Sequence, residues 1–383
     1  MSPIRDNGLR PIDLPPLPQE PLVSVLSGNC NYASFLPDAI ESVLGQTYGN
    51  FEFIICDDGS TDASRAILNR YRSADPRIQV IFQENAGQAA ALNAAFRASR
   101  GEILCFLDTD DVYVPEKLQR VVQTLAANPG VGLVVHKLVR VNASRTRKLG
   151  EIPLVFDLPS GWLGATAPLV TSWAPRGIPP CSALTLRRAV AQRIFPLRLG
   201  LRTCADEQIR VLAPLLTPIS ALAEPLTEYR VHGGNAIAVP KFTEAQARRM
   251  MEYDHEVWMA WRDFLMSSSC KQPIPREPAV TLNSYAYACI RRDPSARRLR
   301  RAFLKGPQFR EMPALHRVFW RVSSLLPEWG FSRAFAFMHG QPAAKLFISP
   351  LLQWIRDLRG EKKDVHYSTD EKLRAENGEP AGD

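Results

Sequence analysis

The chain has 383 residues, of which 45% are hydrophobic and 22% charged, so it can bury a large core and has the ordinary composition of a globular protein. Its seven cysteines include no C-x-x-C pair, which argues against a zinc site or a disulfide framework and favours a reducing compartment. No apolar segment is long enough to span a bilayer, and the net charge of +8 favours anionic partners. We therefore expect a cytoplasmic protein that is at most attached peripherally to the inner face of the membrane.

A proline-rich, irregular leader is expected over residues 1–20, and regular elements follow it. Short apolar runs with the composition of buried strands alternate with segments of helical spacing, which is the pattern of βαβ units and a parallel sheet. Ser60 or Thr61 is expected to cap a helix that ends near Tyr71. The predicted strands are residues 22–27, 51–56, 78–82, 103–107 and 132–140, and further helices are expected at 35–44 and 88–99.

Two acidic turns follow the second and fourth predicted strands. The first is residues 57–62, Asp-Asp-Gly-Ser-Thr-Asp, and the second contains Asp108, Asp110 and Asp111. Carboxylates packed this closely repel one another and suit a hard divalent cation such as Mg²⁺ or Mn²⁺. The alternative is an acidic N-cap for a helix that starts near residue 115. Right-handed crossovers bring both turns to one sheet edge, where open α/β sheets bind ligands, and this favours a ligand site. For Asp111, the alternative of a helix N-cap stays open.

The turn after the first strand does not carry a phosphate-binding glycine motif. Residues 28–31 read Gly-Asn-Cys-Asn, which supplies one glycine and neither G-x-G-x-x-G nor the P-loop pattern. A phosphate ligand would then need another counter-charge, and a metal ion on the carboxylates would supply it.

Several short motifs occur in order along residues 21–142. They are Val-Ser-Val in the first strand, Asn31, the segment 42–48, the acidic turn 57–62, Asn-Ala-Gly at 85–87 and Leu-Asp-Thr-Asp-Asp at 107–111. Together they resemble the family 2 glycosyltransferases of the GT-A fold, and a looser resemblance continues to about Asn235. It implies an α/β, Rossmann-like, mostly parallel sheet flanked by helices over residues 21–240, with a donor half at about 21–142 and an acceptor half at about 143–240.

The resemblance also implies a donor site. Asp58, with Asp57 beside it, would hydrogen-bond the base or ribose of the nucleotide. Asp108 and Asp110 would hold Mn²⁺ or Mg²⁺ on the donor diphosphate, so that Asp108 also belongs to the substrate site. Cys30 stands where relatives often carry an aromatic residue, which leaves the identity of the base open. The other expected substrate-binding residues of this half are Gly28, Asn29, Asn31 and Asn85.

The acceptor half contains one carboxylate of interest, Asp206, at the start of a segment with helical spacing. Its plain interpretation is a first-turn acid that complements the helix dipole. By resemblance, Asp206 matches the aspartate that serves the family as general base. Ala205 replaces the glutamate that usually precedes it, and the adjacent Glu207 is the rival candidate.

Residues 229–235, Tyr-Arg-Val-His-Gly-Gly-Asn, resemble a further segment found in many relatives. His232 could complete the metal shell or contact a phosphate, although a lone histidine is more often structural. Arg230 could pair with a phosphate of the donor. The two glycines suggest a loop able to close on the donor.

A helical, basic extension is expected at residues 241–360 and a disordered tail at 361–383. Its plain interpretation is a helical subdomain with a solvated basic face. The sharper alternative is an interfacial surface for anionic lipid, which would suit a lipid-linked acceptor. Nucleic acid is not expected as a partner, because no recognised binding module is present.

The sequence thus favours an inverting, metal-dependent glycosyltransferase that moves a sugar from a nucleoside-diphosphate sugar, UDP-linked in the first instance, to a hydroxyl of a glycan or lipid-linked acceptor. Such an activity would belong to polysaccharide or cell-envelope biosynthesis. Two alternatives stay open: a non-catalytic partner or regulator that binds a nucleotide sugar, and a sugar nucleotidyltransferase.

Overall fold

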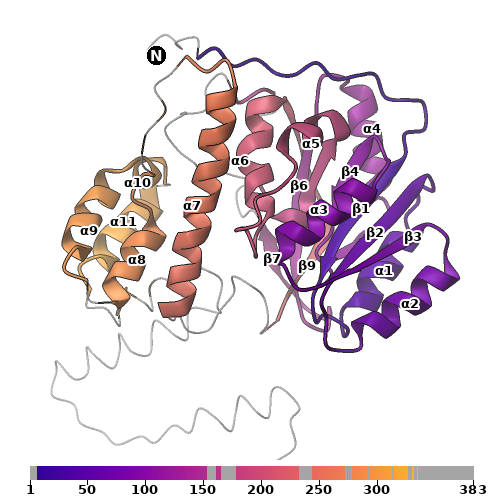
Figure 1. The fold of residues 1–383 in the computed structure, drawn as a ribbon, viewed down its shortest axis with the longest axis horizontal. Helices are drawn as coiled ribbons and strands as arrows, with labels where there is room; N and C mark the ends of the chain where they lie inside the picture. Colours follow the sequence, from indigo (N-terminus) through magenta and orange to yellow (C-terminus); the bar gives the residue numbers. More distant parts are fainter. Residues whose placement is uncertain are drawn as a thin grey trace, which may run out of the picture.

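The fold of the chain is built around one mixed sheet with helices on both faces (Figure 1). The strand order is β3-β2-β1-β4-β8-β6-β9-β5, with β7 paired to β6. The computed structural model describes residues 7–152, 161–164, 178–232, 244–271, 278–291, 293–312 and 314–326, with 274, 276, 330, 331 and 334. The expected tail, residues 153–160 and 165–177 of the acceptor half, and the glycines at 233–234 lie outside the described residues.

The parallel half of the sheet contains the strands predicted for the first hundred residues. Its elements are β1 (Val23–Asn29), α1 (Leu36–Leu44), β2 (Phe51–Asp58), α2 (Ser64–Ala74), β3 (Ile78–Gln83), α3 (Gln88–Ala98) and β4 (Ile103–Phe106). Strand β1 lies between β2 and β4 and is parallel to both. The predicted cap of α2 is wrong: the N-cap residue is Ala63, and the Ser60 hydroxyl donates instead to Asp57 (2.6 Å).

The other half of the sheet is mixed. Strand β4 pairs antiparallel with β8, which pairs antiparallel with β6, and β6 pairs parallel with β9. The predicted strand at 132–140 is confirmed as β6. The elements are β5 (Val112–Tyr113), α4 (Lys117–Ala127), β6 (Leu133–Asn142), β7 (Lys148–Ile152), a 3₁₀ turn (Cys181–Ala183), β8 (Leu184–Arg187), α5 (Arg188–Ile194), α6 (Asp206–Leu216) and β9 (Ile219–Val231).

Two hydrophobic clusters cover the two faces of the sheet. Side chains of a strand alternate between faces, so Leu26 of β1 joins a cluster with α3, α5 and α6, whereas its neighbour Val25 joins one with α1, α2 and α4. Both residues are fully buried. Burial on both faces explains why β2 and β4, which are buried throughout, read as nearly continuous apolar runs.

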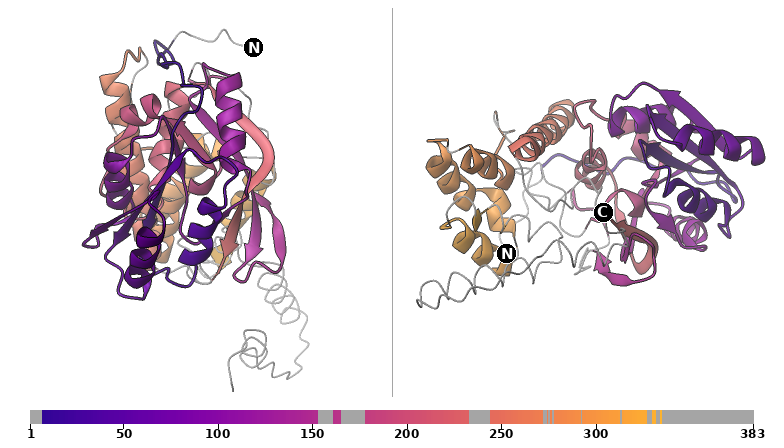
Figure 2. Two further views of the ribbon diagram at one scale, coloured as in Figure 1. Left: turned by 90° about the vertical axis from the view of Figure 1, so that its right-hand side faces the viewer. Right: turned by 90° about the horizontal axis from the view of Figure 1, so that it is seen from below.

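Segments before and after the sheet also pack on this domain. Residues 7–20 form no helix or strand, yet Leu9 is buried in the core and the Ile12 amide donates to the Leu216 carbonyl (2.8 Å). Toward the C-terminus, α7 (Glu244–Ser267) packs on α6, and a cluster of further helices packs beyond it (Figures 1 and 2). That cluster is α8 (Leu282–Ile290), α9 (Ala296–Lys305), α10 (Pro307–Glu311) and α11 (Ala314–Ser323). None of the described helices is both long and apolar enough to cross a bilayer.

We expect Leu26→Ala to lower the free energy of unfolding by about 2–5 kcal/mol, because it opens a cavity at the centre of the sheet. Denaturant titration measures the change. Leu199→Ala is the matched control: Leu199 is exposed, so its truncation should stay within about 0.5 kcal/mol. Equal losses in the two variants would contradict the central place of β1 in the core.

Candidate functional site

The carboxylates of the first acidic turn accept hydrogen bonds from within the turn and from neighbouring loops. Asp57 accepts hydrogen bonds from Asn29 Nδ2 (2.8 Å) and from the Ser60 hydroxyl. Asp58 accepts from the backbone amides of Ala86 and Gly87, both at 2.8 Å. Both carboxylates are buried at the carboxyl edge of β2 and hold the turns around them.

The polar residues of the first turn lie beside these carboxylates. Asn29 is buried, and its Oδ1 accepts from the Thr109 hydroxyl (3.2 Å), which joins the ends of β1, β2 and β4. Asn31 has a positive φ of 59°, and its Oδ1 accepts from the Thr61 amide (2.7 Å). Asn85 Nδ2 donates to the Asp58 carbonyl (3.0 Å) and to Cys30 Sγ (3.2 Å). The residues expected to line the nucleotide pocket therefore meet at one edge, and much of their hydrogen bonding is mutual.

The first glycine of that turn, Gly28, is also at this edge. A Cβ added there would lie 3.1 Å from Cβ of Ala91 on α3. Contact this tight means that a side chain at position 28 would push α3 away from β1.

The three aspartates of the second acidic turn have different hydrogen-bond partners. Asp108 Oδ1 accepts from Gln88 Nε2 (3.1 Å), and Asp110 Oδ2 lies 3.0 Å from His232 Nε2. Asp111 accepts from the Ser182 hydroxyl (2.6 Å) and from the Arg230 amide (3.0 Å). The N-cap of α4 is Glu116, without a side-chain cap bond, so the cap alternative for these carboxylates is wrong. Asp111 instead ties this turn to β9.

Charge crowding marks the same turn. Burial raises the pKa of Asp108 above its usual range, and the charges of Asp110 and Asp206 raise it further. Burial also raises the pKa of Asp111, and the charges of Asp110 and Asp108 raise it further. A bound cation would relieve this repulsion.

The donor set fits a hard cation held jointly with a ligand. Among the residues that the structure describes, no group of three or more His, Cys, Asp or Glu side chains is arranged to hold a metal ion. Mg²⁺ is usually bound by one or two carboxylates together with substrate phosphates and water. Asp108 and Asp110 can supply the two carboxylates.

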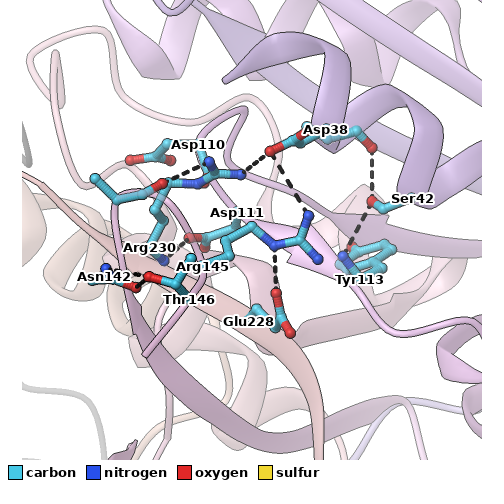
Figure 3. A network of polar contacts seen from close by, with 12 residues as sticks. Asp38, Ser42, Asp110, Asp111, Tyr113, Asn142, Arg145, Thr146, Glu228 and Arg230 are labelled. Carbon is cyan, nitrogen blue, oxygen red and sulfur yellow. Dashed lines mark hydrogen bonds and ion pairs between the residues drawn. The ribbon is translucent and has the colours of Figure 1, made fainter. Parts of the chain in front are cut away.

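His232 and Arg230 lie at the end of β9, against the acidic turn. The His232 ring packs on Phe35, with ring centroids 4.5 Å apart, while its Nε2 meets Asp110. Arg230 is buried, and its guanidinium donates to the carbonyls of Asp110 and Ala143 (both 2.9 Å). It also donates to Asp38 (2.8 Å), a contact drawn in Figure 3. These contacts orient Asp110 and connect β9 to α1. The metal and phosphate roles of the two residues stay predictions.

Asp206 and Glu207 begin α6 and differ in their partners. Glu207 forms an ion pair with Arg210, whose guanidinium also donates to the Ile178 carbonyl (2.7 Å). Burial raises the pKa of Asp206 to about 6, while the charge of Arg210 and the Cys181 amide lower it. Asp206 is thus buried where its charge acts on Asp108, and Arg210 forms its ion pair with Glu207.

Gln88, the first residue of α3, is a polar contact that sequence reasoning missed. Its Nε2 donates to Asp108 and its Oε1 accepts from the Ala205 amide (2.9 Å), so one side chain spans the acidic turn and the start of α6. The Gln88 amide also donates to the Arg202 carbonyl (2.9 Å). Gly87 makes room for this approach, because a Cβ there would lie 2.7 Å from Cα of Arg202. The only sequence signal was a polar residue directly after a turn glycine.

Comparison with known proteins agrees with this geometry. The sequence profile described as "Glycosyl transferase family 2" matches residues 24–192, from the start of β1 into α5. A relative from Nostoc sp., the uncharacterized glycosyltransferase alr2836, is 38% identical over 223 residues.

Residues 24–192 of the chain belong to glycosyltransferase family 2. The sheet flanked by helices agrees with the α/β fold that the sequence predicted. The Nostoc match covers 56% of this chain and 66% of the relative. Glycosyltransferase GlyG of Streptococcus pneumoniae is 37% identical over 103 residues, or 27% of this chain and 34% of GlyG.

Solved structures of similar shape include S. aureus TarS 1-349 in complex with UDP, at 16% identity and a TM-score of 0.48, covering 91% of this chain and 94% of that one. Another is the mannosyltransferase PcManGT from Pyrobaculum calidifontis in complex with GDP-Man and Mn²⁺. It has 17% identity and a TM-score of 0.46, with 91% of each chain covered.

On the prediction that Asp108 is a metal ligand, we expect Gln88→Met to weaken Mn²⁺ binding in the presence of saturating nucleoside diphosphate by about ten-fold, because residues that orient a metal ligand typically contribute this much. Isothermal titration measures the affinity. Arg97→Met, on an exposed position of the same helix, is the control and should leave it unchanged. Affinities within about two-fold of wild type in Gln88→Met would show that Asp108 does not depend on this contact.

Proposed function

We propose that the protein is an inverting, metal-dependent glycosyltransferase. It would transfer a sugar from a nucleoside-diphosphate sugar, UDP-linked in the first instance, to a hydroxyl of a glycan or lipid-linked acceptor. The observation that carries the proposal is the position of Asp206. It is buried directly after Ala205, whose amide shares the Gln88 side chain with Asp108, while Arg210 is paired with Glu207. Family membership and the acidic turn at the carboxyl edge of the sheet support it.

In the proposed reaction Asp206 acts as general base. A carboxyl with a pKa of about 6 is mostly ionised at neutral pH, yet it is basic enough to take a proton as the acceptor oxygen attacks. That oxygen forms its bond to the anomeric carbon from the face opposite the departing diphosphate, which inverts the configuration. Burial excludes water from the carboxylate and favours proton transfer from a bound acceptor.

Asp108 and Asp110 are the residues that would hold Mn²⁺ or Mg²⁺. A bound cation supplies charge neutralisation for the departing diphosphate. The chain prepares these two carboxylates: Gln88 fixes one oxygen of Asp108, and His232 contacts one oxygen of Asp110. These contacts would hold both carboxylates in place for a cation.

Asp206→Asn should lower the rate of transfer by about 10²–10⁴-fold and leave donor affinity unchanged, because it removes the base without altering size. The assay follows release of nucleoside diphosphate from a panel of nucleotide sugars and acceptors. Glu207→Gln is the matched variant, and it should retain most of the transfer activity. Loss in Glu207→Gln with full activity in Asp206→Asn would reassign the base.

The same assay separates the alternatives. Release of pyrophosphate in place of nucleoside diphosphate would identify a sugar nucleotidyltransferase. Donor binding without turnover of any acceptor by the wild type would favour the non-catalytic partner.

A thermal-shift screen of uridine, guanosine, cytidine and adenosine diphosphates tests the donor site itself. The matching nucleotide with Mn²⁺ should stabilise the fold by about 2.7 kcal/mol at a concentration 100-fold above its dissociation constant. Asp110→Asn should remove the increment that depends on Mn²⁺ and keep the weaker shift from nucleotide alone. If no nucleotide stabilises the wild type, the donor-site proposal fails.

A further inference from the structure

Helix α11 and the residues that follow it expose an apolar face to solvent. Val318, Val322, Leu325 and Leu326 follow the i, i+4, i+7, i+8 spacing of a single helix face, and their exposed fractions are 62%, 56%, 69% and 39%. We call these four residues the outer face of α11. Among the described residues, the other exposed large apolar side chains are Leu199 and Met266, which lie far away in the sequence.

The packing of α11 does not use its outer face. The opposite side of the helix carries Trp320, which is buried in the hydrophobic cluster of the C-terminal helices with Tyr285 and Phe331. Ser323 and Ser324 are buried on that side too. The packing of α11 in the core is therefore provided by this buried side, and the apolar side chains of the outer face do not contribute to it.

Basic side chains surround the outer face. Residues 296–326 hold eight Lys or Arg and one acidic residue, Glu311. Arg317 and Arg321 are exposed on the same helix. Helix α9 lies beside its end, where Arg300 Nε donates to the Ser324 hydroxyl (3.0 Å). In the part of the chain that the structure describes, no ion pair joins a basic residue of 296–326 to a carboxylate.

We propose that the outer face of α11 docks on the surface of an anionic lipid bilayer. Aliphatic side chains can enter the boundary between headgroups and acyl chains, while arginines beside them bind lipid phosphates. A nucleic acid would use the same cations but has no need of four exposed aliphatic side chains. The inference deepens the proposed function, on which it rests in one respect: a docked enzyme would meet a lipid-linked acceptor at the membrane.

Vesicle flotation with the full chain tests the proposal. The protein should float with vesicles of phosphatidylcholine mixed with phosphatidylglycerol, and should not float with phosphatidylcholine alone. Val318→Ser/Val322→Ser/Leu325→Ser should reduce binding by about ten-fold or more, because binding strength follows buried apolar area. The matched control Leu199→Ser/Met266→Ser removes equally exposed apolar side chains elsewhere and should bind as the wild type does. Arg317→Gln/Arg321→Gln should lose about five-fold for each arginine.

Four results would overturn the proposal. The first is no flotation of the wild type with the anionic vesicles, or equal flotation with both kinds. The second is equal binding by the triple serine variant, which would point to a polyanion site that needs charge alone. The third is a lowered melting temperature of that variant, which would mean that another part of this chain covers the face. The fourth is a dimer in sedimentation that the variant dissociates, which would make the face an interface between copies.

Failure here is distinguishable from failure of the proposed transfer reaction. The same preparations are tested for stabilisation by nucleoside diphosphate and Mn²⁺. A wild type that is stabilised but does not float retains the donor site and loses the membrane proposal. The serine variant should keep the full nucleotide shift, because its substitutions lie in the C-terminal helices.

Discussion

Repulsion between carboxylates is the constraint on which the arrangement of this site depends. Asp57 and Asp58 end β2, and Asp108, Asp110 and Asp111 follow β4, so all five lie at one edge of the sheet. Helix α6 adds Asp206, whose charge acts on Asp108. Buried charges of one sign are tolerated only when hydrogen bonds or counter-ions compensate them. The chain compensates them unequally, and that inequality separates supporting residues from candidates for chemistry. Asp57 and Asp58 close turns through internal hydrogen bonds, and Glu207 is paired with Arg210.

The start of α6 is held from two sides. On one side, Gln88 of α3 contacts both Asp108 and the Ala205 amide. On the other, Arg198 forms ion pairs with Glu256 (2.7 Å) and Asp263 (3.2 Å) of α7. The segment between them includes Cys204, which has a positive φ of 53°. Because α7 also carries the basic C-terminal helices, the helix of the proposed base shares a support with the proposed membrane-docking face.

The parallel half of the fold could be predicted because its signals are local. A buried parallel strand is apolar at nearly every position, so the runs at residues 103–107 and, apart from Glu52, 51–56 could be recognised as strands. A strand that ends in aspartates places them at the ligand edge. The order of motifs from Val-Ser-Val to Asp-Thr-Asp-Asp indicated the family, which the comparisons confirm. Even the local signals had limits: Ser60 looked like a helix cap, but a nearby buried carboxylate competes for its hydroxyl.

By itself the sequence determined the family, the fold class and the residues from which a donor site would be built, since these depend on composition, spacing and strand ends. Only the tertiary structure decided how the carboxylates share their partners. Asp111 turned out to bind Ser182 and the Arg230 amide, and Gln88 to bridge Asp108 and Ala205, across separations of 71, 119, 20 and 117 residues. The physical reason is that a hydrogen bond depends on the direction and distance of two groups in space, and no local pattern in the chain encodes a partner that folding brings from so far away.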